Sequence, residues 1–154
     1  MTLEHFGNPL LEQRRLAEGK AYVERTDQIV FSISGEDRAT WLHALVSQDI
    51  LNLKPGQSTE ALLLSPQGHI EHQLKVICDL EQLLVITSLE RSGALMDWLA
   101  KMRFRSKVAV ETKDLRVFGV FTEIEGLSWV DGFSLESARS VRYSTERAEF
   151  SYRE

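Results

Sequence analysis

Residues 63–74 read LLSPQGHIEHQL, and this run predicts a tight hairpin between two strands. Pro66 presets φ for a turn, and Gly68 supplies the positive φ that such turns often need. After the turn, apolar and polar residues alternate from His69 to Asp79, as they do along a half-buried strand. Strands joined by so short a turn run antiparallel, so an antiparallel sheet is expected.

The segments on either side of this hairpin show strand and helix patterns in turn. Gln28 to Ser34 alternates as a strand, and Glu36 to Val46 repeats apolar residues at helical spacing, with Ser34 as the expected N-cap. The expected helices are Pro9–Glu18, Glu36–Val46 and Glu90–Met102, and the expected strands are Ala21–Arg25, Gln28–Ser34, Glu60–Leu64, His69–Asp79, Leu83–Thr87, Val108–Glu111, Arg116–Thr122 and Ser140–Ser144. This order predicts an α+β fold, an antiparallel β-sheet with helices packed on one face.

Composition places the chain among ordinary globular proteins. It has 154 residues, 43% hydrophobic and 27% charged, with a formal net charge of -5. Residues 1–154 are therefore expected to form a single domain, with no overall attraction for nucleic acid or for an anionic membrane. The lone cysteine, Cys78, excludes an intrachain disulfide, and no signal peptide or apolar run of about 20 residues is present, so a cytoplasmic location is expected.

Titratable groups gather just after the hairpin turn. His69, Glu71 and His72 offer acid, base or ligand chemistry within four residues. The two-residue period of a strand places His69 and Glu71 on one face and His72 on the other, so the three converge only if a β-bulge intervenes. The alternative is a solvated pair of His69 and Glu71 beside a hydrogen-bonded His72. A metal site is not expected, because His-x-x-His lacks a third ligand at suitable spacing.

Three segments in series resemble a known family. Residues 33–50, ISGEDRATWLHALVSQDI, are similar to the signature that opens the folate-binding YgfZ-type proteins and their relative, the T protein of glycine cleavage. Residues 62–71, LLLSPQGHIE, resemble the hairpin element that follows in this family. Residues 99–110, LAKMRFRSKVAV, resemble the next helix-to-strand segment, so that the likeness runs in order through residues 20–122.

The resemblance implies that this chain supplies the first domain around a central cavity for tetrahydrofolate. Residues 1–154 would then be the N-terminal part of a longer folate-binding protein, and the last five residues, FSYRE, carry no stop signal. The T protein uses an aspartate just after the hairpin turn, where this chain has Glu71 or His72. The resemblance thus assigns catalytic positions to Glu71 and His72, and folate contacts to the hairpin residues Ser65, Gln67, Gly68, His69 and Glu71.

Three functions remain open on the sequence alone. YgfZ-type proteins are implicated in maintaining iron-sulfur enzymes, which makes iron-sulfur proteins the expected partners, although their later Lys-Gly-Cys run is absent from this chain. A glutamate or histidine in place of the T-protein aspartate weakens the second interpretation, a folate-dependent aminomethyltransferase. The third is an interaction domain without a ligand, which pairs through exposed edges.

A basic cluster and three tryptophans complete the sequence features. The cluster comprises Lys101, Arg103, Arg105 and Lys107. It could bind an anion, such as the polyglutamate tail of a folate or an RNA phosphate, but a solvated helix end is the favoured interpretation, because cations suit the C-terminal dipole. The tryptophans Trp41, Trp98 and Trp129 are expected to anchor the core, and Cys78 is expected to be a buried small apolar residue.

Overall fold

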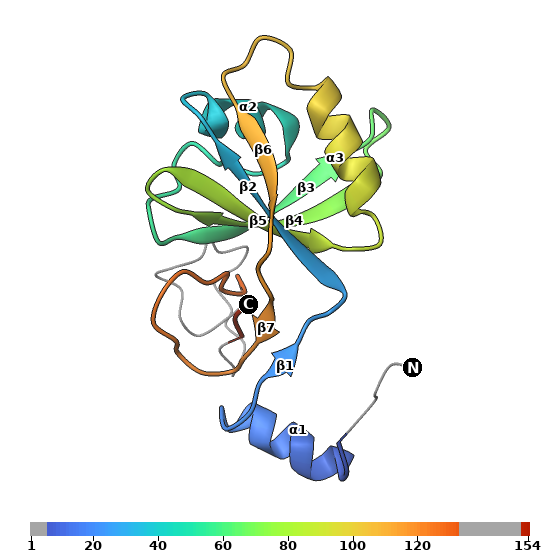
Figure 1. The fold of residues 1–154 in the computed structure, drawn as a ribbon, viewed down its shortest axis with the longest axis vertical. Helices are drawn as coiled ribbons and strands as arrows, with labels where there is room; N and C mark the ends of the chain where they lie inside the picture. The colour runs from blue at the N-terminus through green and yellow to red at the C-terminus, as the bar shows by residue number, and fades with distance from the viewer. Residues whose placement is uncertain (1–5, 133–151) are drawn as a thin grey trace.

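The structure is a computed structural model that describes residues 6–132 and 152–154. Its centre is a five-stranded antiparallel sheet in the order β3-β4-β5-β2-β6, with α2 and α3 on one face, which confirms the predicted α+β class (Figure 1). The elements are α1 Pro9–Ala17, β1 Val23–Glu24, β2 Gln28–Ser34, α2 Arg38–Leu45, β3 Ser58–Leu64, β4 Ile70–Cys78, β5 Gln82–Ser88, α3 Ser92–Lys101, β6 Ala109–Lys113 and β7 Phe118–Gly119. The expected strand Ser140–Ser144 lies outside the described residues.

The helix-covered face of the sheet holds the larger core. Strand β2 runs between β5 and β6, and its alternation sends Phe31 and Ile33 toward the helices. Leu74 and Val76 of β4 join them with no exposed surface. The fully or nearly buried members are Phe31, Ile33, Trp41, Leu42, Ile50, Ala61, Leu63, Leu74, Val76, Leu83, Val85, Leu95, Leu99 and Val108. This cluster removes most of its apolar surface from water and supplies the main driving force for folding.

The helices are tied to each other by a tryptophan and to the sheet by a glycine turn. Trp41 is 6% exposed, and its Nε1 donates to the carbonyl of Met102 at 2.9 Å, which confirms its predicted role as a core anchor. Gly35 has φ +110°, and a Cβ there would lie 2.1 Å from the carbonyl oxygen of Lys107. Only glycine fits this close approach.

The start of α2 differs from its prediction. Ser34 is the last residue of β2 and not the N-cap of the helix, which begins at Arg38 after Asp37. The Asp37 carboxylate does not cap the helix but accepts a hydrogen bond from the Lys107 backbone N–H at 2.7 Å. The helix therefore begins at Arg38 and not at the predicted Glu36, because residues 35–37 form a turn that packs against Lys107 in the loop after α3.

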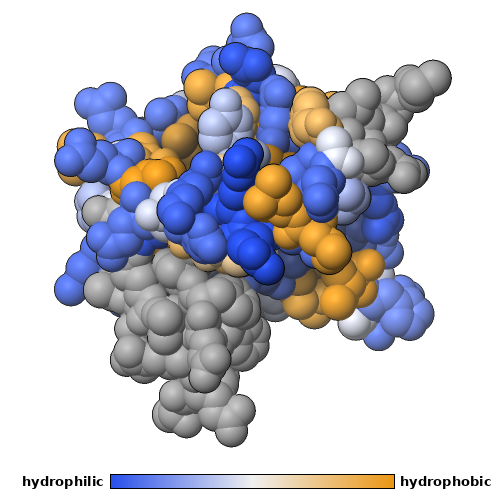
Figure 2. Space-filling model, turned by 90° about the horizontal axis from the view of Figure 1, so that it is seen from below, coloured by the Kyte–Doolittle hydropathy of each residue, from blue (hydrophilic) through white to orange (hydrophobic). Residues whose placement is uncertain are grey.

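Helix α1 contributes no buried residue to the hydrophobic core. Asn8 caps it, since its side-chain oxygen accepts from the backbone N–H groups of Leu10 and Leu11 at 3.1 and 3.2 Å, and Gly19 at φ +70° follows its end. The helix has no buried residue, and Leu10 is 78% exposed. The view from below, the end where α1 lies, shows hydrophobic side chains among hydrophilic ones (Figure 2). None of the helices in the described residues has both the length and the apolar character needed to cross a bilayer.

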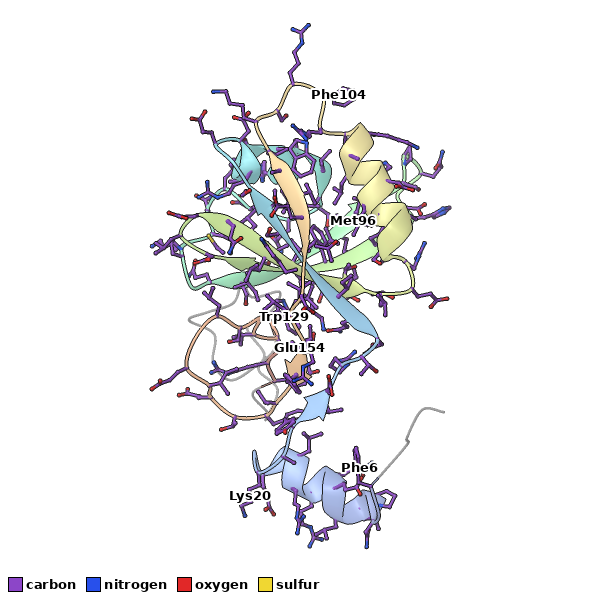
Figure 3. All side chains as sticks on the ribbon, in the orientation of Figure 1. Phe6, Lys20, Met96, Phe104, Trp129 and Glu154 are labelled. Atoms are coloured by element: carbon purple, nitrogen blue, oxygen red, sulfur yellow. The ribbon has the colours of Figure 1, made fainter. Side chains whose placement is uncertain are left out.

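The second face of the sheet is covered by the segment after β6 and by residues 152–154. Trp129 is 3% exposed, and its Nε1 donates to the carbonyl of Thr59 on β3 at 3.2 Å, so this tryptophan is also a core anchor as predicted. Arg153 pairs with both Val120 and Val130 through isolated β-bridges. Figure 3 shows Trp129 and Glu154 close together beneath the sheet. A smaller apolar cluster of Val30, Ile77, Ile86, Val117 and Trp129 forms there.

Candidate functional site

The hairpin between β3 and β4 closes as the sequence predicts. The backbone N–H of Gly68 donates to the carbonyl of Ser65 at 2.9 Å, and Gly68 has φ +83°. The Ser65 hydroxyl oxygen accepts from the N–H groups of Gln67 and His69 at 3.3 and 3.1 Å. These bonds occupy Ser65 within the turn and leave Gln67, Gly68 and His69 exposed at its tip.

A β-bulge lies directly after this turn. Leu63 pairs with His72, but the next residue, Leu64, pairs with Ile70, which leaves Glu71 as the extra residue on β4. A bulge of this kind interrupts the alternation of side chains between the two faces of a strand. As a result Glu71 and His72 line the same two pockets, and they do not separate to opposite faces as the regular strand period predicts.

The first pocket is an apolar groove along α3, called here the α3 groove. Its volume is about 580 Å³. Helix α3 contributes Ala94, Trp98 and the adjoining Met102, which are four residues apart and therefore share one helix face. The end of β3, the turn and the bulge supply the opposite wall: Leu63, Leu64, Ser65, Pro66, Glu71 and His72. The volume falls within the range of small-molecule sites.

The second pocket, called here the polar pocket, lies toward the other face of the sheet. It has a volume of about 500 Å³. Charged and amide side chains from six parts of the chain line it, together with Glu71 and His72: Arg25, Asp27, Gln28, Glu60, Gln73, Lys75, Arg91, Asp131 and Glu154. The bulge therefore marks the junction between an apolar and a polar cavity.

Burial and a neighbouring cation favour the neutral form of the His72 imidazole beside Glu71. Glu71 lies 3.9 Å from the guanidinium of Arg91, and both side chains are about half exposed, so this ion pair is weak. Burial, and after it the positive charge of Arg91, lowers the pKa of His72, while Glu71 opposes the shift. At neutral pH the imidazole is uncharged, and it can donate one hydrogen bond and accept another.

A buried carboxylate organises the far side of the polar pocket. The Glu154 side chain is fully buried, and its oxygens accept from Arg25 Nη1 at 2.6 Å, from the Tyr152 hydroxyl at 2.7 Å and from Lys75 Nζ. The Lys75 ammonium also lies 4.6 Å from the centre of the Trp129 ring. Two cations and a hydroxyl thus compensate one buried charge, which is the arrangement that burial requires.

The same network shifts the pKa values of its members. A hydrogen bond from the Arg25 guanidinium lowers the pKa of Asp27, and the bond to Asp27 is the main cause that raises the pKa of Arg25. Burial, assisted by the hydrogen bond to Glu154, raises the pKa of Tyr152 to about 12. No sequence motif marks this cluster, because its partners are 79 and 129 residues from Glu154 along the chain.

The hairpin residues named from the sequence fall into two groups. Ser65, Glu71 and His72 come together in the wall of the α3 groove, whereas Gln67, Gly68 and His69 occupy the turn tip and line neither pocket. Within residues 6–132 and 152–154, no group of three or more His, Cys, Asp or Glu side chains is arranged to hold a metal ion.

Cys78 lies away from both pockets. It is half-buried against the helix-side core and not fully buried as predicted, and burial raises the pKa of its thiol. Of the last five residues of the chain, Phe150 and Ser151 lie outside the described part.

Comparison with known proteins adds evidence on the fold. No protein-family model matches the chain. The crystal structure of glycine cleavage system aminomethyltransferase T from Bartonella henselae superposes with a TM-score of 0.60 at 17% sequence identity. The match covers 64% of this chain but only 27% of the aminomethyltransferase. The chain therefore shares its α+β fold with part of a glycine cleavage aminomethyltransferase T.

Proposed function

We propose that this chain binds a tetrahydrofolate at the junction of the α3 groove and the polar pocket, as the N-terminal part of a longer folate-binding protein. The observation that carries the proposal is the bulge that brings Glu71 and His72 to both pockets. The shared fold with part of an aminomethyltransferase T supports it, because the sequence resemblance to that family implies a tetrahydrofolate cavity. Ligands often bind where an apolar cavity meets a few convergent polar groups.

The chemistry of a folate suits the two pockets. The pterin ring presents adjacent N–H donors on one edge, and a carboxylate such as Glu71 accepts from two such donors at once. The neutral imidazole of His72 can donate to, or accept from, a ring nitrogen. The p-aminobenzoyl ring is apolar and flat, and Leu64, Trp98 and Met102 offer it an apolar wall.

The remaining hairpin residues have different parts in the proposal. Ser65 contributes to the groove wall, although its hydroxyl oxygen already accepts two bonds within the turn. Gln67, Gly68 and His69 would contact a bound folate only where it extends past the turn tip. A loss of folate affinity on substitution of His69 would therefore indicate that the ligand contacts the turn tip as well as the groove.

A role beside iron-sulfur proteins is our proposal for the whole protein, and aminomethyl transfer is the second candidate. Glu71 keeps a carboxylate near the hairpin turn but one methylene further from the backbone than an aspartate. Such a displacement of a reacting group lowers catalysis steeply, which favours a binding role. The shared fold with an aminomethyltransferase favours the second candidate.

Titration calorimetry of tetrahydrofolate into the chain tests the binding proposal. Wild type is expected to bind, and Glu71→Gln and His72→Ala are each expected to weaken binding at least tenfold, because a hydrogen bond with a charged or buried partner is lost. Glu111→Gln is the matched control, since Glu111 lies on the opposite edge strand β6 and pairs with Lys113. Binding that is equally strong in all four proteins would contradict the proposed site.

A cellular assay separates the two candidate roles. Cells that lack the full-length gene are expected to lose iron-sulfur enzyme activity, and the wild-type gene is expected to restore it while the Glu71→Gln gene does not. Restored glycine cleavage without any change in iron-sulfur enzymes would favour aminomethyl transfer instead.

A further inference from the structure

Strand β6 forms one edge of the central sheet (Figure 1). Its inner side pairs with β2 along its whole length, from Ala109 opposite Ser34 to Lys113 opposite Val30. In the part of the chain that the structure describes, no further hydrogen bond reaches the backbone of this strand. Alternate residues of an edge strand direct their N–H and C=O groups away from the neighbouring strand, so β6 presents a row of groups that another strand can bind.

The opposite edge of the sheet is closed by the chain itself. The backbone N–H of Ser47 donates to the carbonyl of Leu62 on β3 at 2.9 Å, and Trp129 Nε1 donates to the carbonyl of Thr59 on the same strand at 3.2 Å. The amide of Gln48 donates to a third β3 carbonyl at 3.3 Å. The fold thus protects β3 from other strands but leaves the outer side of β6 accessible.

The side chains of β6 carry one charge of each sign. Glu111 and Lys113 lie on the sheet face away from the helices, and their charged atoms are 3.2 Å apart. Thr112 lies opposite Phe31 on the helix-covered face, where both residues line an apolar pocket of about 200 Å³ together with Met96 of α3. Charged side chains on an edge strand normally hinder its pairing with other strands. Two opposite charges hinder some pairings and favour another.

A second copy of this chain can pair with β6 in one register without opposing like charges. A two-fold axis through an antiparallel pair places one residue opposite its own copy, and directly opposite residues share a face of the sheet. With Thr112 at the centre, Glu111 lies opposite Lys113 of the partner subunit, and the symmetry makes this pair twice. Each of the other four centres opposes like charges: Glu111 with itself, Lys113 with itself, Lys107 with Lys113 for a centre at Val110, and Arg105 with Lys113 for a centre at Ala109.

We infer that β6 pairs antiparallel with β6 of a second copy of this chain, with the two-fold axis at Thr112. The two sheets become one continuous sheet, and the helices of both copies cover the same face. On the other face, Glu111 and Lys113 of the two subunits form a ring of four alternating charges. On the helix-covered face, the two Thr112 side chains form a cross-strand pair, which is a favourable combination. The interface uses none of the residues that line the α3 groove or the polar pocket, so the inference does not depend on folate binding.

Sedimentation equilibrium of the 154-residue chain tests the inference. An edge of five residues forms a small interface, so we expect a dissociation constant on the order of 10–100 µM. The apparent mass should rise from that of the 17.6 kDa monomer toward twice this value between about 5 and 500 µM protein. Salt at about 0.15 M screens the repulsion between two chains that each carry a net charge of -5.

Charge reversal tests the register. Glu111→Lys and Lys113→Glu should each raise the dissociation constant at least tenfold, because two cross-strand pairs change from attraction to repulsion. An equimolar mixture of these two variants should form a heterodimer about as stable as the wild-type dimer, since every cross-strand pair is again one of opposite charge. The double variant Glu111→Lys, Lys113→Glu should likewise recover the homodimer. Far-UV circular dichroism verifies that each variant is folded.

A matched variant controls for the change in net charge. Glu18→Lys reverses a carboxylate in an exposed pair with Lys20 that has the same two-residue spacing, and Glu18 lies just after α1, outside the sheet. This variant should dimerise as the wild type does. If Glu18→Lys abolishes the dimer while the β6 variants keep it, the interface lies at α1 and the inference is overturned.

Three further results also overturn the inference. A wild-type chain that remains monomeric at about 500 µM would leave the edge of β6 to a strand of a different kind, such as one from another part of a longer protein. Dimers of Glu111→Lys or Lys113→Glu that are as stable as the wild-type dimer would exclude the Thr112 register. A mixture of the two variants that stays monomeric would show that these charges do not meet across an interface.

Discussion

The two faces of the central sheet are stabilised by different physical means. On the helix-covered face, Phe31, Leu74 and Val76 pack against α2 and α3 in a core that is almost wholly apolar. On the other face, a smaller apolar cluster shares the surface with the buried Glu154 carboxylate and its cations. Burial of apolar area is insensitive to pH, whereas an ion cluster depends on the protonation of each member.

This difference shows how one sheet can combine a firm scaffold with a polar site. The helix side fixes the strands and the hairpin, and the ion cluster holds residues 152–154 against the polar pocket. The bulge at Glu71 lies between the apolar face and the polar face of the sheet, since Glu71 and His72 line both the apolar groove and the polar pocket. Substitutions on each face, and one on the surface, should therefore differ in the size of their effects.

Truncation of Leu74 should have the largest effect. Leu74→Ala removes a fully buried side chain from the helix-side core and should lower the free energy of unfolding by about 3 kcal/mol. Leu115→Ala, at a residue that is 52% exposed, should cost less than about 0.5 kcal/mol. Urea denaturation measures both variants. A cost below about 1 kcal/mol for Leu74→Ala would contradict the assignment of the main core to this face.

Loss of one cation from the ion cluster should rank second. Lys75→Met leaves Glu154 buried with Arg25 as its remaining cation, so the free energy of unfolding should fall by about 2 kcal/mol, less than for a buried charge left alone. The double variant Lys75→Met, Glu154→Gln should recover much of this loss, because the buried charge is also removed. Additive losses in the double variant would mean that the two side chains do not interact.

The stability of the protein at alkaline pH should depend on Tyr152. Its pKa is raised to about 12 in the folded protein, above the value near 10 of an unfolded chain, so its contribution is complete below pH 10 and is lost between about pH 10 and 12. The effect should not exceed about 1 kcal/mol, since the ring is only half-buried and solvent screens the charge. The midpoint temperature of thermal unfolding should therefore fall less steeply with rising pH in Tyr152→Phe than in the wild type. Identical slopes for the two proteins would remove Tyr152 from the network.

A surface ion pair should have the smallest effect. Lys107 and Glu36 lie 2.7 Å apart, but their side chains are 73% and 78% exposed. Lys107→Ala should change the free energy of unfolding by no more than about 0.5 kcal/mol, since exposed pairs are screened by water and salt. Urea denaturation at low and high salt measures this. A loss comparable with that of Lys75→Met would mean that burial does not set the strength of ion pairs in this protein.

Sequence patterns predict the elements of the fold well where the signal is local. Gln28–Ser34 alternates over its full length and forms β2 with the predicted bounds. The turn at Ser65 to Gly68 follows from the backbone preferences of proline and glycine. Period two and turn chemistry depend on neighbouring residues only, so one sequence is sufficient for such predictions.

The candidate site depends on features that have no local signal. No glycine or proline marks the bulge at Glu71, and a regular strand would have separated Glu71 from His72. The Glu154 cluster joins residues that are 79 and 129 positions apart, and only the folded chain brings them together. Sequence reasoning therefore finds the hairpin residues but misses Arg25, Lys75 and Arg91 around them.

The bulge at Glu71 and His72 is the part of the molecule on which the proposed folate site depends. Backbone amide NMR during titration with tetrahydrofolate reports on this bulge residue by residue. We expect the largest chemical-shift changes on Glu71, His72, Ala94 and Trp98, with little change on β6. Saturable shifts confined to α1 or β6, or no shifts in a folded chain at ligand concentrations well above those of the protein, would contradict the proposed site.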